Sequence, residues 1–404
     1  MICPVPPEPD SKRALALVMK LMAIPGKTGQ EGRIVRFVTQ QLVRAGAEGG
    51  RISTDRAFER SPIGGQSGNL KLRLPGTIRG PRRMLMAHLD TVPLCVGCKP
   101  VRRGGLVRSA NPSTALGADN RSGVAVVLTA ALEILRRKLP HPPVTFFFPV
   151  QEEIGLVGVR NASLGPLGRP ALAFNFDSGD TNGLILGATG AYRMTIEVAG
   201  IASHAGVHPR DGVSAITIAA MAIASLEADG WHGLITKGKK KGTSNVGIIN
   251  GGDATNVVTP HVTVRAEARS HDPQFRKRIV NEISRRFQQA ARNLKNNAGH
   301  HGSVEIDSAL DYESFELRPA HPCVRAAAAA VRTIGGVPHP VIVDGGLDAN
   351  WITARGIPTV TLGAGQHHAH TVNEILNVEE FQQGCRLALR LATGTEGDDG
   401  PAFG

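Results

Sequence analysis

Six side chains that can bind a metal ion or carry a proton stand at separate points of the sequence. They are His88, Asp119, Glu152, Glu153, Asp177 and His370. Imidazole and carboxylate ligands together suit zinc, and they also accept cobalt or manganese. Two such ions about 3.5–4 Å apart need a bridging carboxylate, and together they activate a water molecule toward a carbonyl group. A further carboxylate that is not a ligand can carry the proton to the leaving amine. The set therefore indicates amide hydrolysis.

Each of these residues also has an ordinary structural explanation. A histidine after a strand is usually structural, two adjacent glutamates usually lie in a solvated loop, and an aspartate before a helix is usually its N-cap. The N-cap explanation is the main alternative for Asp119. These explanations do not predict a shared location, so the positions of the residues relative to the expected strands decide between them.

The expected strands place these residues at one edge of a sheet. Buried strands are predicted over residues 84–87, 144–150 and 171–176. His88, the pair Glu152-Glu153 and Asp177 follow these strands, Asp119 precedes a predicted helix at 122–136, and His370 follows a glycine-rich turn. Ligands of open α/β sheets gather at the carboxyl ends of the strands. We therefore expect these residues to converge.

The order of predicted elements indicates two domains. Helices at 12–24 and 31–45, followed by alternating strands and helices, predict an α/β domain with a mostly parallel sheet. A β-α-β-β-α-β order from about residue 188 predicts an α+β, ferredoxin-like domain of four strands and two helices. Strands and helices alternate again after about residue 319. We expect a discontinuous domain (1–187 and 316–395), an inserted domain (188–315) and a flexible acidic tail (396–404).

Composition narrows the class of protein. The chain has 404 residues, 41% hydrophobic and 20% charged, which is typical of a globular protein of about two domains. The net charge is +12, but the basic residues are spread along the chain. The densest run is Lys239-Lys240-Lys241, between glycines in a predicted loop. Without a zinc-finger or RNA-binding signature, we expect no nucleic-acid partner.

The cysteines and the start of the chain indicate a cytoplasmic protein. Five cysteines form a sparse, odd set that does not resemble a disulfide framework. The first ten residues are proline-rich and unlike a signal peptide, and no run of 18 apolar residues predicts a membrane span. Cys95 and Cys98 form a Cys-x-x-Cys pair, for which an ordinary loop, a redox-active pair and a metal-binding pair are the alternatives.

Five short motifs resemble those of the M20 metallopeptidases, in the order of that family. They are residues 86–93 (MAHLDTVP), 116–120 (LGADN), 151–155 (QEEIG), 176–179 (FDSG) and 370–374 (HTVNE). Residues 345–350 (GGLDAN) and 356–359 (GIPT) are most similar to the peptidase T-like branch of this superfamily, which also contains carboxypeptidase G2 and aminoacylases. The resemblance implies a zinc-exopeptidase-like α/β/α catalytic domain with an inserted lid or dimerisation domain.

The resemblance also implies a role for each metal ligand. His88 and Asp177 would bind one divalent ion, Glu153 and His370 would bind a second, and Asp119 would bridge the two. Zinc is the expected metal, with cobalt or manganese as alternatives. His368 lies two residues from His370 and competes with it as a ligand, although the motif spacing favours His370.

Two residues near these ligands are implied to act in catalysis. Glu152 would be the general base. Asp90 would hold the imidazole of His88 in the tautomer that suits a metal ligand.

The inserted domain is implied to contribute further groups. Residues 200–206 (GIASHAG) resemble a lid motif whose histidine, here His204, stabilises the tetrahedral oxyanion, often in the partner subunit. Asn256, Arg269 and the turn of Gly345 and Gly346 are implied to hold the substrate. A surface histidine and a strand-edge salt bridge are the alternatives for His204 and Arg269.

The sequence thus predicts a metal-dependent exopeptidase for short peptides, of the tripeptide aminopeptidase type, acting as a homodimer through the inserted domain. A carboxypeptidase or an N-acyl-amino-acid deacylase of the same family is the first alternative. A non-catalytic basic binding protein on a hydrolase fold is the second. The metal site is far better specified by the residues than the substrate is.

Overall fold

The computed structural model describes residues 7–397 and 400–403, and it divides into two compact units. The first unit contains residues 1–187, 316–343 and 347–404, and the second contains residues 188–315 and 344–346. Residues 1–6, in the segment where we expected no signal peptide, lie outside the described residues, as do residues 398, 399 and 404 of the expected tail.

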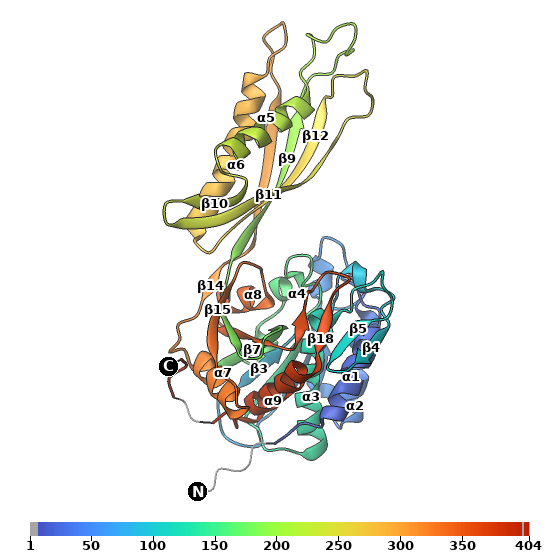
Figure 1. Cartoon of the computed structure of the whole chain (residues 1–404), viewed down its shortest axis with the longest axis vertical. Helices are drawn as coiled ribbons and strands as arrows, with labels where there is room; N and C mark the ends of the chain where they lie inside the picture. The colour runs from blue at the N-terminus through green and yellow to red at the C-terminus, as the bar shows by residue number, and fades with distance from the viewer. Residues whose placement is uncertain (1–6, 398–399, 404) are drawn as a thin grey trace. The chain divides into compact units, whose positions relative to one another are not determined.

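The first unit is built on a nine-stranded sheet in the order β1-β2-β6-β3-β7-β16-β8-β14, with β15 paired to β8 (Figure 1). The strands are β1 (Ile52–Thr54), β2 (Leu70–Leu74), β3 (Arg83–Met86), β6 (Val144–Phe148), β7 (Leu172–Ser178), β8 (Gly183–Ala188), β14 (Phe315–Glu316), β15 (His339–Val343) and β16 (Thr359–Gly363). The central strands β6, β3, β7 and β16 run parallel, whereas β2 and β8 pair antiparallel with their neighbours. The predicted α/β class is confirmed, and the parallel part is the centre of the sheet.

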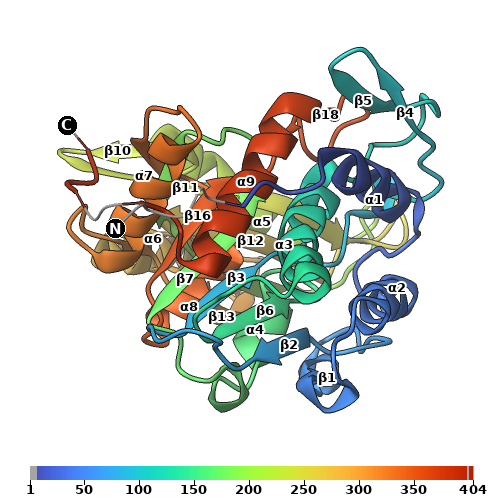
Figure 2. The same ribbon diagram turned by 90° about the horizontal axis from the view of Figure 1, so that it is seen from below.

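Helices cover both faces of this sheet. They are α1 (Ser11–Ala23), α2 (Gly32–Arg44), α3 (Ala118–Arg137), α4 (Val157–Asn161), α7 (Pro322–Thr333), α8 (Asp348–Ala354) and α9 (Val378–Thr393). Figure 2 shows α7, α9 and α3 on one face, with α4 and α8 on the other. Helix α3 is buried from Asn120 to Ile134, because alanine, valine and leucine occupy nearly all of its circumference. Its start, which carries Asp119, is therefore fixed by packing on all sides.

A second, small sheet lies in the first unit and was not predicted. Its order is β17-β18-β5-β4, with strands β4 (Pro100–Arg103), β5 (Leu106–Ser109), β17 (Gln366–His367) and β18 (Ile375–Asn377). Strands β17 and β18 flank the loop that carries His370, so this sheet fixes both ends of that loop.

The second unit is an antiparallel sheet with two helices. The sheet order is β10-β11-β12-β9-β13, with strands β9 (Gly190–Ala199), β10 (Gly233–Lys237), β11 (Lys240–Gly251), β12 (His261–Ser270) and β13 (Ser303–Tyr312). Helices α5 (Ala215–Ala228) and α6 (Pro273–Asn293) lie side by side, and their apolar residues share one core with the strands (Figure 1).

This sheet has five strands, where four were predicted. The additional strand is β10, in which only Ile235 is buried, so no alternation of polar and apolar residues marks it. Lys239 lies in the turn between β10 and β11, but Lys240 and Lys241 belong to β11 rather than to a loop.

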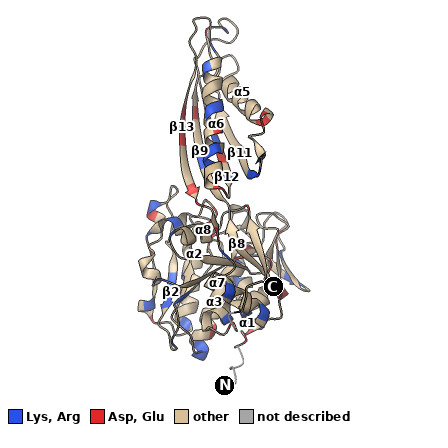
Figure 3. Cartoon of the chain, turned by 90° about the vertical axis from the view of Figure 1, so that its left-hand side faces the viewer, with Lys and Arg blue, Asp and Glu red and all other residues tan. Residues whose placement is uncertain are grey.

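Basic residues gather on α6, where Figure 3 shows Lys and Arg in blue. Several are paired with acids: Arg276 with Glu313, Arg285 with Glu282, and Arg286 with Asp229. Much of the positive charge on this helix is therefore neutralised within the unit.

Part of the expected flexible tail packs against the first unit. Glu396 is buried and pairs with Arg83 at 2.6 Å, and Arg332 donates to the carbonyl oxygens of Pro401 and Ala402.

Among the described residues, no helix combines the length and the apolar character needed to cross a membrane.

One acidic side chain of the first unit, Glu31, is buried in surroundings that disfavour its ionised form. Glu31 is fully buried at the start of α2; one oxygen accepts a hydrogen bond from the Gly29 amide at 2.7 Å, and the other has no partner among the described residues. Burial, followed by the nearby Asp90 carboxylate, raises the pKa of Glu31 from 4.5 to about 7. The folded state therefore binds a proton more tightly than the unfolded state does.

This raised pKa predicts a pH-dependent stability. The contribution of protonated Glu31 is fully present below pH 4.5 and is lost as pH rises through about 7. The pKa difference corresponds to at most about 3 kcal/mol. Glu31→Gln, which keeps an acceptor for Gly29, is therefore expected to match the wild type in Tm at pH 4 and to exceed it at pH 8. Thermal unfolding at both pH values measures this, with the exposed Glu59→Gln as control. An equal Tm difference at the two pH values would contradict the prediction.

Candidate metal centre

The first unit brings the predicted ligands together at the carboxyl ends of its central parallel strands. His88 lies two residues after β3, Glu152 and Glu153 follow β6, and Asp177 lies near the end of β7. Asp119 follows Gly117, whose φ of 73° suits glycine and turns the chain into α3. The convergence expected from the strand pattern is therefore found.

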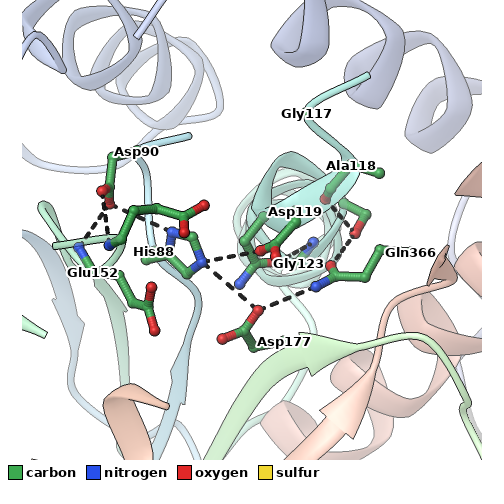
Figure 4. Close-up of polar contacts among 12 residues, drawn as sticks. His88, Asp90, Gly117, Ala118, Asp119, Gly123, Glu152, Asp177 and Gln366 are labelled. Carbon is green, nitrogen blue, oxygen red and sulfur yellow. Dashed lines mark hydrogen bonds and ion pairs between the residues drawn. The ribbon is translucent and has the colours of Figure 1, made fainter. Parts of the chain in front are cut away.

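His88 occupies the centre of this cluster (Figure 4). Its Nε2 lies 3.2 Å from Oδ1 of Asp119 and 3.7 Å from Oδ1 of Asp177. Its Nδ1 lies 3.4 Å from Oδ1 of Asp90, on the opposite side of the ring. The two ring nitrogens of His88 therefore face carboxylates on opposite sides of the ring.

His370 faces the same cluster from the loop between β17 and β18. Its Nε2 lies 2.9 Å from Oε2 of Glu153 and 3.3 Å from Oδ2 of Asp119. The two oxygens of Asp119 are therefore divided between two histidines. The neighbouring His367 is paired with Glu380, and His368 is exposed. Of the three histidines in this loop, His370 is the one that contacts the acidic cluster.

The adjacent glutamates have different surroundings. Asp90 accepts hydrogen bonds from the backbone amides of both Glu152 and Glu153, at 3.0 and 3.2 Å, and from the Thr28 hydroxyl at 2.8 Å. The Glu153 carboxylate faces His370. The Glu152 carboxylate makes no hydrogen bond or ion pair within the described part of the chain, and it points toward His88 and Asp177 (Figure 4).

The excess of negative charge in the cluster suits the binding of cations. The carboxylates that lie in it or act on it electrostatically outnumber its two histidines. They include those of Asp90, Asp119, Glu152, Glu153, Asp177 and Asp348. Potential ligand atoms of His88, Glu152 and Asp177 lie within 4.8 Å of one another, as do those of His88, Asp119 and Glu153. Oε1 of Glu153 is buried without a hydrogen-bond partner among the described residues. The donor set and its excess of negative charge match a site for divalent metal ions.

The pKa shifts reflect this crowding. Burial disfavours a charged His88, but Asp177, Asp119 and Asp90 outweigh it and raise the pKa of His88 well above its ordinary value. Hydrogen bonds from the His370 ring to the carboxylates of Asp119 and Glu153 raise the pKa of His370 to about 10. Burial and the neighbouring carboxylates Asp177 and Asp348 raise the pKa of Glu152 well above its ordinary value. In each case the cluster favours positive charge or bound protons.

Three residues that support the cluster had no predicted role. The Glu374 carboxylate accepts from the backbone amides of Gly117 and Asp119 at 2.6 and 2.8 Å. The Gln366 amide accepts from the Ser122 hydroxyl and donates to Oδ1 of Asp177 at 3.2 Å. Glu374 could have been found from its fixed spacing after His370, whereas no sequence signal marked Gln366.

The third unassigned residue is Asp348. It is buried at the start of α8, and neither carboxylate oxygen has a partner among the described residues. Burial raises the pKa of Asp348 well above its ordinary value, and Asp177 adds to this effect, while His88 opposes it.

His204 and Asn256 belong to the second unit and lie beside each other there. The Ala205 amide donates to the Asn256 carbonyl at 2.9 Å. The Nδ1 atom of the exposed His204 accepts from the amides of Gly206 and Val207, at 3.2 and 3.1 Å. A neutral His204 therefore carries its proton on Nε2, which leaves an N–H donor at the outer edge of the ring.

The other predicted substrate residues also lie in the second unit. Arg269 forms an ion pair with Glu267 through two hydrogen bonds, at 2.9 and 3.0 Å, as in the alternative prediction of a strand-edge salt bridge. Gly346 lies against the ring of Tyr312, where an added Cβ would be 2.4 Å from a ring carbon, whereas Gly345 has open space around it.

The cysteines next to the first metal motif are free thiols. Cys95 and Cys98 are buried and lie in one turn, in which the Cys98 amide donates to the Cys95 carbonyl at 3.1 Å. Burial raises the pKa of Cys98 to about 11 and raises that of Cys95 further. Both are therefore protonated at neutral pH, which makes them weak nucleophiles and weak metal ligands.

The chain is similar to known proteins along nearly its whole length. The sequence profile of peptidase family M20/M25/M40 matches residues 84–394. The uncharacterized protein YqjE of Bacillus subtilis (strain 168) is 29% identical over 383 residues, which cover 95% of this chain and 98% of that protein.

Two solved structures are similar along nearly the whole chain. A tripeptidase from Staphylococcus aureus subsp. aureus mu50 has a TM-score of 0.85 and 28% identity, covering 96% of this chain and 100% of its own. The aminopeptidase PepT from Bacillus cereus ATCC 10987 has a TM-score of 0.80 and 30% identity, covering 95% and 98%.

The Glu374 contacts predict an effect on metal binding. Glu374→Gln would place an amide donor against one of the two backbone N–H groups that now fix Asp119, so we expect the affinity for zinc to fall roughly 10–100-fold. Competition with a chromogenic chelator measures this. Glu379→Gln, an exposed acid five residues further on, serves as the control. An unchanged zinc affinity in the Glu374 variant would show that the contact does not position Asp119.

Proposed function

Because the chain belongs to peptidase family M20/M25/M40, we propose that it is a metal-dependent exopeptidase of short peptides, of the tripeptide aminopeptidase type. Family membership makes the chain a hydrolase of peptide bonds. The observation that carries the finer proposal is the division of the Asp119 carboxylate between His88 and His370, with the unpaired Glu152 carboxylate beside them. The similar tripeptidase and aminopeptidase structures support the choice of substrate class.

The proposed ligands form two groups that share one carboxylate. His88 and Asp177 would hold one divalent ion, Glu153 and His370 would hold another, and the Asp119 carboxylate would contribute to both. Zinc is the proposed metal, with cobalt or manganese as alternatives. When bound, such a pair polarises the scissile carbonyl group and lowers the pKa of a water molecule.

The chain's own residues then move the proton and orient the groups. Glu152 takes the proton from the attacking water and delivers it to the nitrogen of the leaving amine. Asp90, whose Oδ1 lies 3.4 Å from Nδ1 of His88, holds the imidazole in the tautomer that keeps Nε2 available as a ligand.

The second unit supplies substrate contacts in this proposal. His204 donates its Nε2–H to the developing oxyanion. Asn256, Arg269 and the turn of Gly345 and Gly346 hold the peptide, and Arg269 exchanges Glu267 for the substrate when it does so. A homodimer formed through this unit, located in the cytoplasm, completes the proposal.

The first test distinguishes the proposed general base, Glu152, from a proposed metal ligand, Glu153. Glu152→Gln is expected to lower kcat for trialanine by roughly 10²–10⁴-fold, because the proton carrier is lost, while the metal content stays near that of the wild type. The adjacent Glu153→Gln is the matched control and should lose metal as well as activity. Steady-state kinetics with metal analysis of each variant decide this. Full activity in the Glu152 variant would contradict its role.

The second test concerns the metal ions. Freshly purified protein is expected to hold about two divalent ions per chain, and chelation should abolish hydrolysis until zinc or cobalt is restored. Activity that persists in metal-free protein would refute the mechanism.

Parallel assays with a tripeptide, an N-blocked peptide and an N-acetyl amino acid distinguish an aminopeptidase from the alternatives, a carboxypeptidase and a deacylase.

A further inference from the structure

We propose that Cys95 and Cys98 form a reversible disulfide bond, and that this bond lowers the affinity of the metal centre for zinc. Both are free thiols in the structure, and they belong to the turn that follows the first metal motif. The inference rests on the proposed function, to which it adds control by oxidation and reduction. The oxidant is a low-molecular-weight disulfide.

The two cysteines occupy the first and fourth positions of a tight turn. Val96 has φ −68° and ψ 124°, and Gly97 has φ 87°. The turn is closed by a hydrogen bond from the Cys98 amide to the Cys95 carbonyl, at 3.1 Å. These values are those of a type II β-turn, in which the Cα atoms of the first and fourth residues lie less than about 7 Å apart. A disulfide joins Cα atoms about 4.4–6.8 Å apart, so the bond fits this backbone.

Both thiols lie on the inner side of the turn. Cys95 and Cys98 are buried, whereas Val96 and Gly97 between them are exposed. Burial raises the pKa of each thiol, and the Glu374 carboxylate adds to this effect in both. The two sulfur atoms therefore share one environment, and the exposed backbone between them leaves the turn accessible to a small oxidant.

Oxidation proceeds by two exchanges with the small disulfide, RSSR. The Cys98 thiolate attacks one sulfur of RSSR, so that a mixed disulfide forms on Cys98 and one RS⁻ leaves. The Cys95 thiolate then attacks Sγ of Cys98, so that the internal bond forms and the second RS⁻ leaves. The protons of the two thiols pass to the two RS⁻ groups, and two electrons reduce RSSR. Cys98 reacts first because its pKa, about 11, is raised less than that of Cys95.

Burial of the thiols slows this exchange without opposing its result. Because both thiols are protonated at neutral pH, the exchange is slow there and becomes faster as the pH rises toward 11. Protein disulfides are easily reduced when the protein stabilises the thiolate that reduction produces. Here burial disfavours the thiolates of Cys95 and Cys98, so the reduced form gains no such stabilisation.

Cys95 also contacts the segment that positions Asp119. A Cβ atom added at Gly117 would lie 3.5 Å from Sγ of Cys95, so the thiol packs against this glycine. The Ala115 amide donates to the carbonyl of Leu94 at 3.1 Å, which ties the two segments together. Gly117 is the residue at which the chain turns toward Asp119 and into α3. The position of the Cys95 side chain therefore bears on the backbone before Asp119.

Disulfide formation changes this packing. Sγ of Cys95 must come within about 2.05 Å of Sγ of Cys98, and it is thereby drawn away from Gly117. Glu374 holds the amides of Gly117 and Asp119 at 2.6 and 2.8 Å, so a shift of Gly117 reaches the Asp119 carboxylate. Loss of a contact that supports a ligand lowers metal affinity roughly 10–100-fold. We expect the lower end of this range, because the disulfide alters packing and leaves the hydrogen bonds of Glu374 in place.

Peptide mapping tests the bond itself. Reduced, metal-free protein is incubated with oxidised glutathione at pH 7 and pH 9, free thiols are blocked with iodoacetamide, and peptides are identified by mass spectrometry. We expect Cys95 and Cys98 to become joined to each other, faster at pH 9, while the buried Cys323 and Cys385 stay free. Alkylation of both Cys95 and Cys98, or a lasting glutathione adduct on either, would overturn the proposal.

Zinc affinity tests the effect on the metal centre. Reduced and diamide-oxidised protein are compared by competition with a chromogenic chelator, because diamide accepts the two hydrogen atoms and leaves no adduct. We expect an affinity about ten-fold lower in the oxidised wild type, restored by a phosphine reductant. Cys98→Ser leaves Cys95 against Gly117 and should keep the affinity of the reduced wild type before and after diamide. Cys323→Ser, a change in a distant buried thiol, should respond as the wild type does.

Equal zinc affinity in the two states of the wild type, or the same loss in Cys98→Ser, would overturn the proposal. Neither measurement needs peptide hydrolysis, so the result is separate from that of the proposed function. Zinc affinity that depends on oxidation in a protein that cleaves no peptide would retain the disulfide and refute the activity. Hydrolysis that responds to chelation but not to oxidation would refute the role of the disulfide alone. A reduced protein that binds no zinc would refute both.

Discussion

An excess of buried carboxylate over positive charge is the constraint on which the first unit depends. Burying an ionised carboxylate is costly unless a cation or hydrogen bonds compensate for it. Around His88 the acids outnumber the histidines, and His88, His370 and Glu152 hold protons more tightly than ordinary side chains do. A pair of divalent cations would supply the same compensation while releasing these protons. The structure therefore favours metal binding on electrostatic grounds before any catalytic role is considered.

The surrounding fold keeps these mutually repelling groups in place. Parallel strands β3, β6 and β7 present their carboxyl ends side by side, and α3 is packed on all sides. Backbone amides do much of the remaining positioning: Asp90 accepts those of Glu152 and Glu153, and Glu374 accepts those of Gly117 and Asp119. Because backbone atoms carry these contacts, the geometry of the cluster is set by the rigid sheet and helix rather than by flexible side chains.

Much of this arrangement could be predicted from the sequence, for identifiable reasons. His88 and Asp177 follow strongly apolar strands, so their convergence follows from sheet geometry. Strand β10 was missed because it is exposed on both faces apart from Ile235, and the small sheet was missed because its strands are short. Gln366 was missed because its role depends on a partner nearly two hundred residues away in the sequence.

Because β16 lies between β7 and β8, the central sheet cannot be completed until residues 359–363 have been synthesised. Strands β7 and β8 are nearly consecutive in sequence, yet they are separated in the sheet by a strand from residues 359–363. Four of the proposed ligands leave the ribosome before the second unit begins, and His370 follows only after it. At ordinary elongation rates of 5–20 residues per second this interval is roughly 10–40 s. Throughout that time the nascent sheet exposes an open apolar edge and an incomplete acidic cluster, so this is the interval in which a chaperone or an early-bound metal ion would affect the yield of folded protein most.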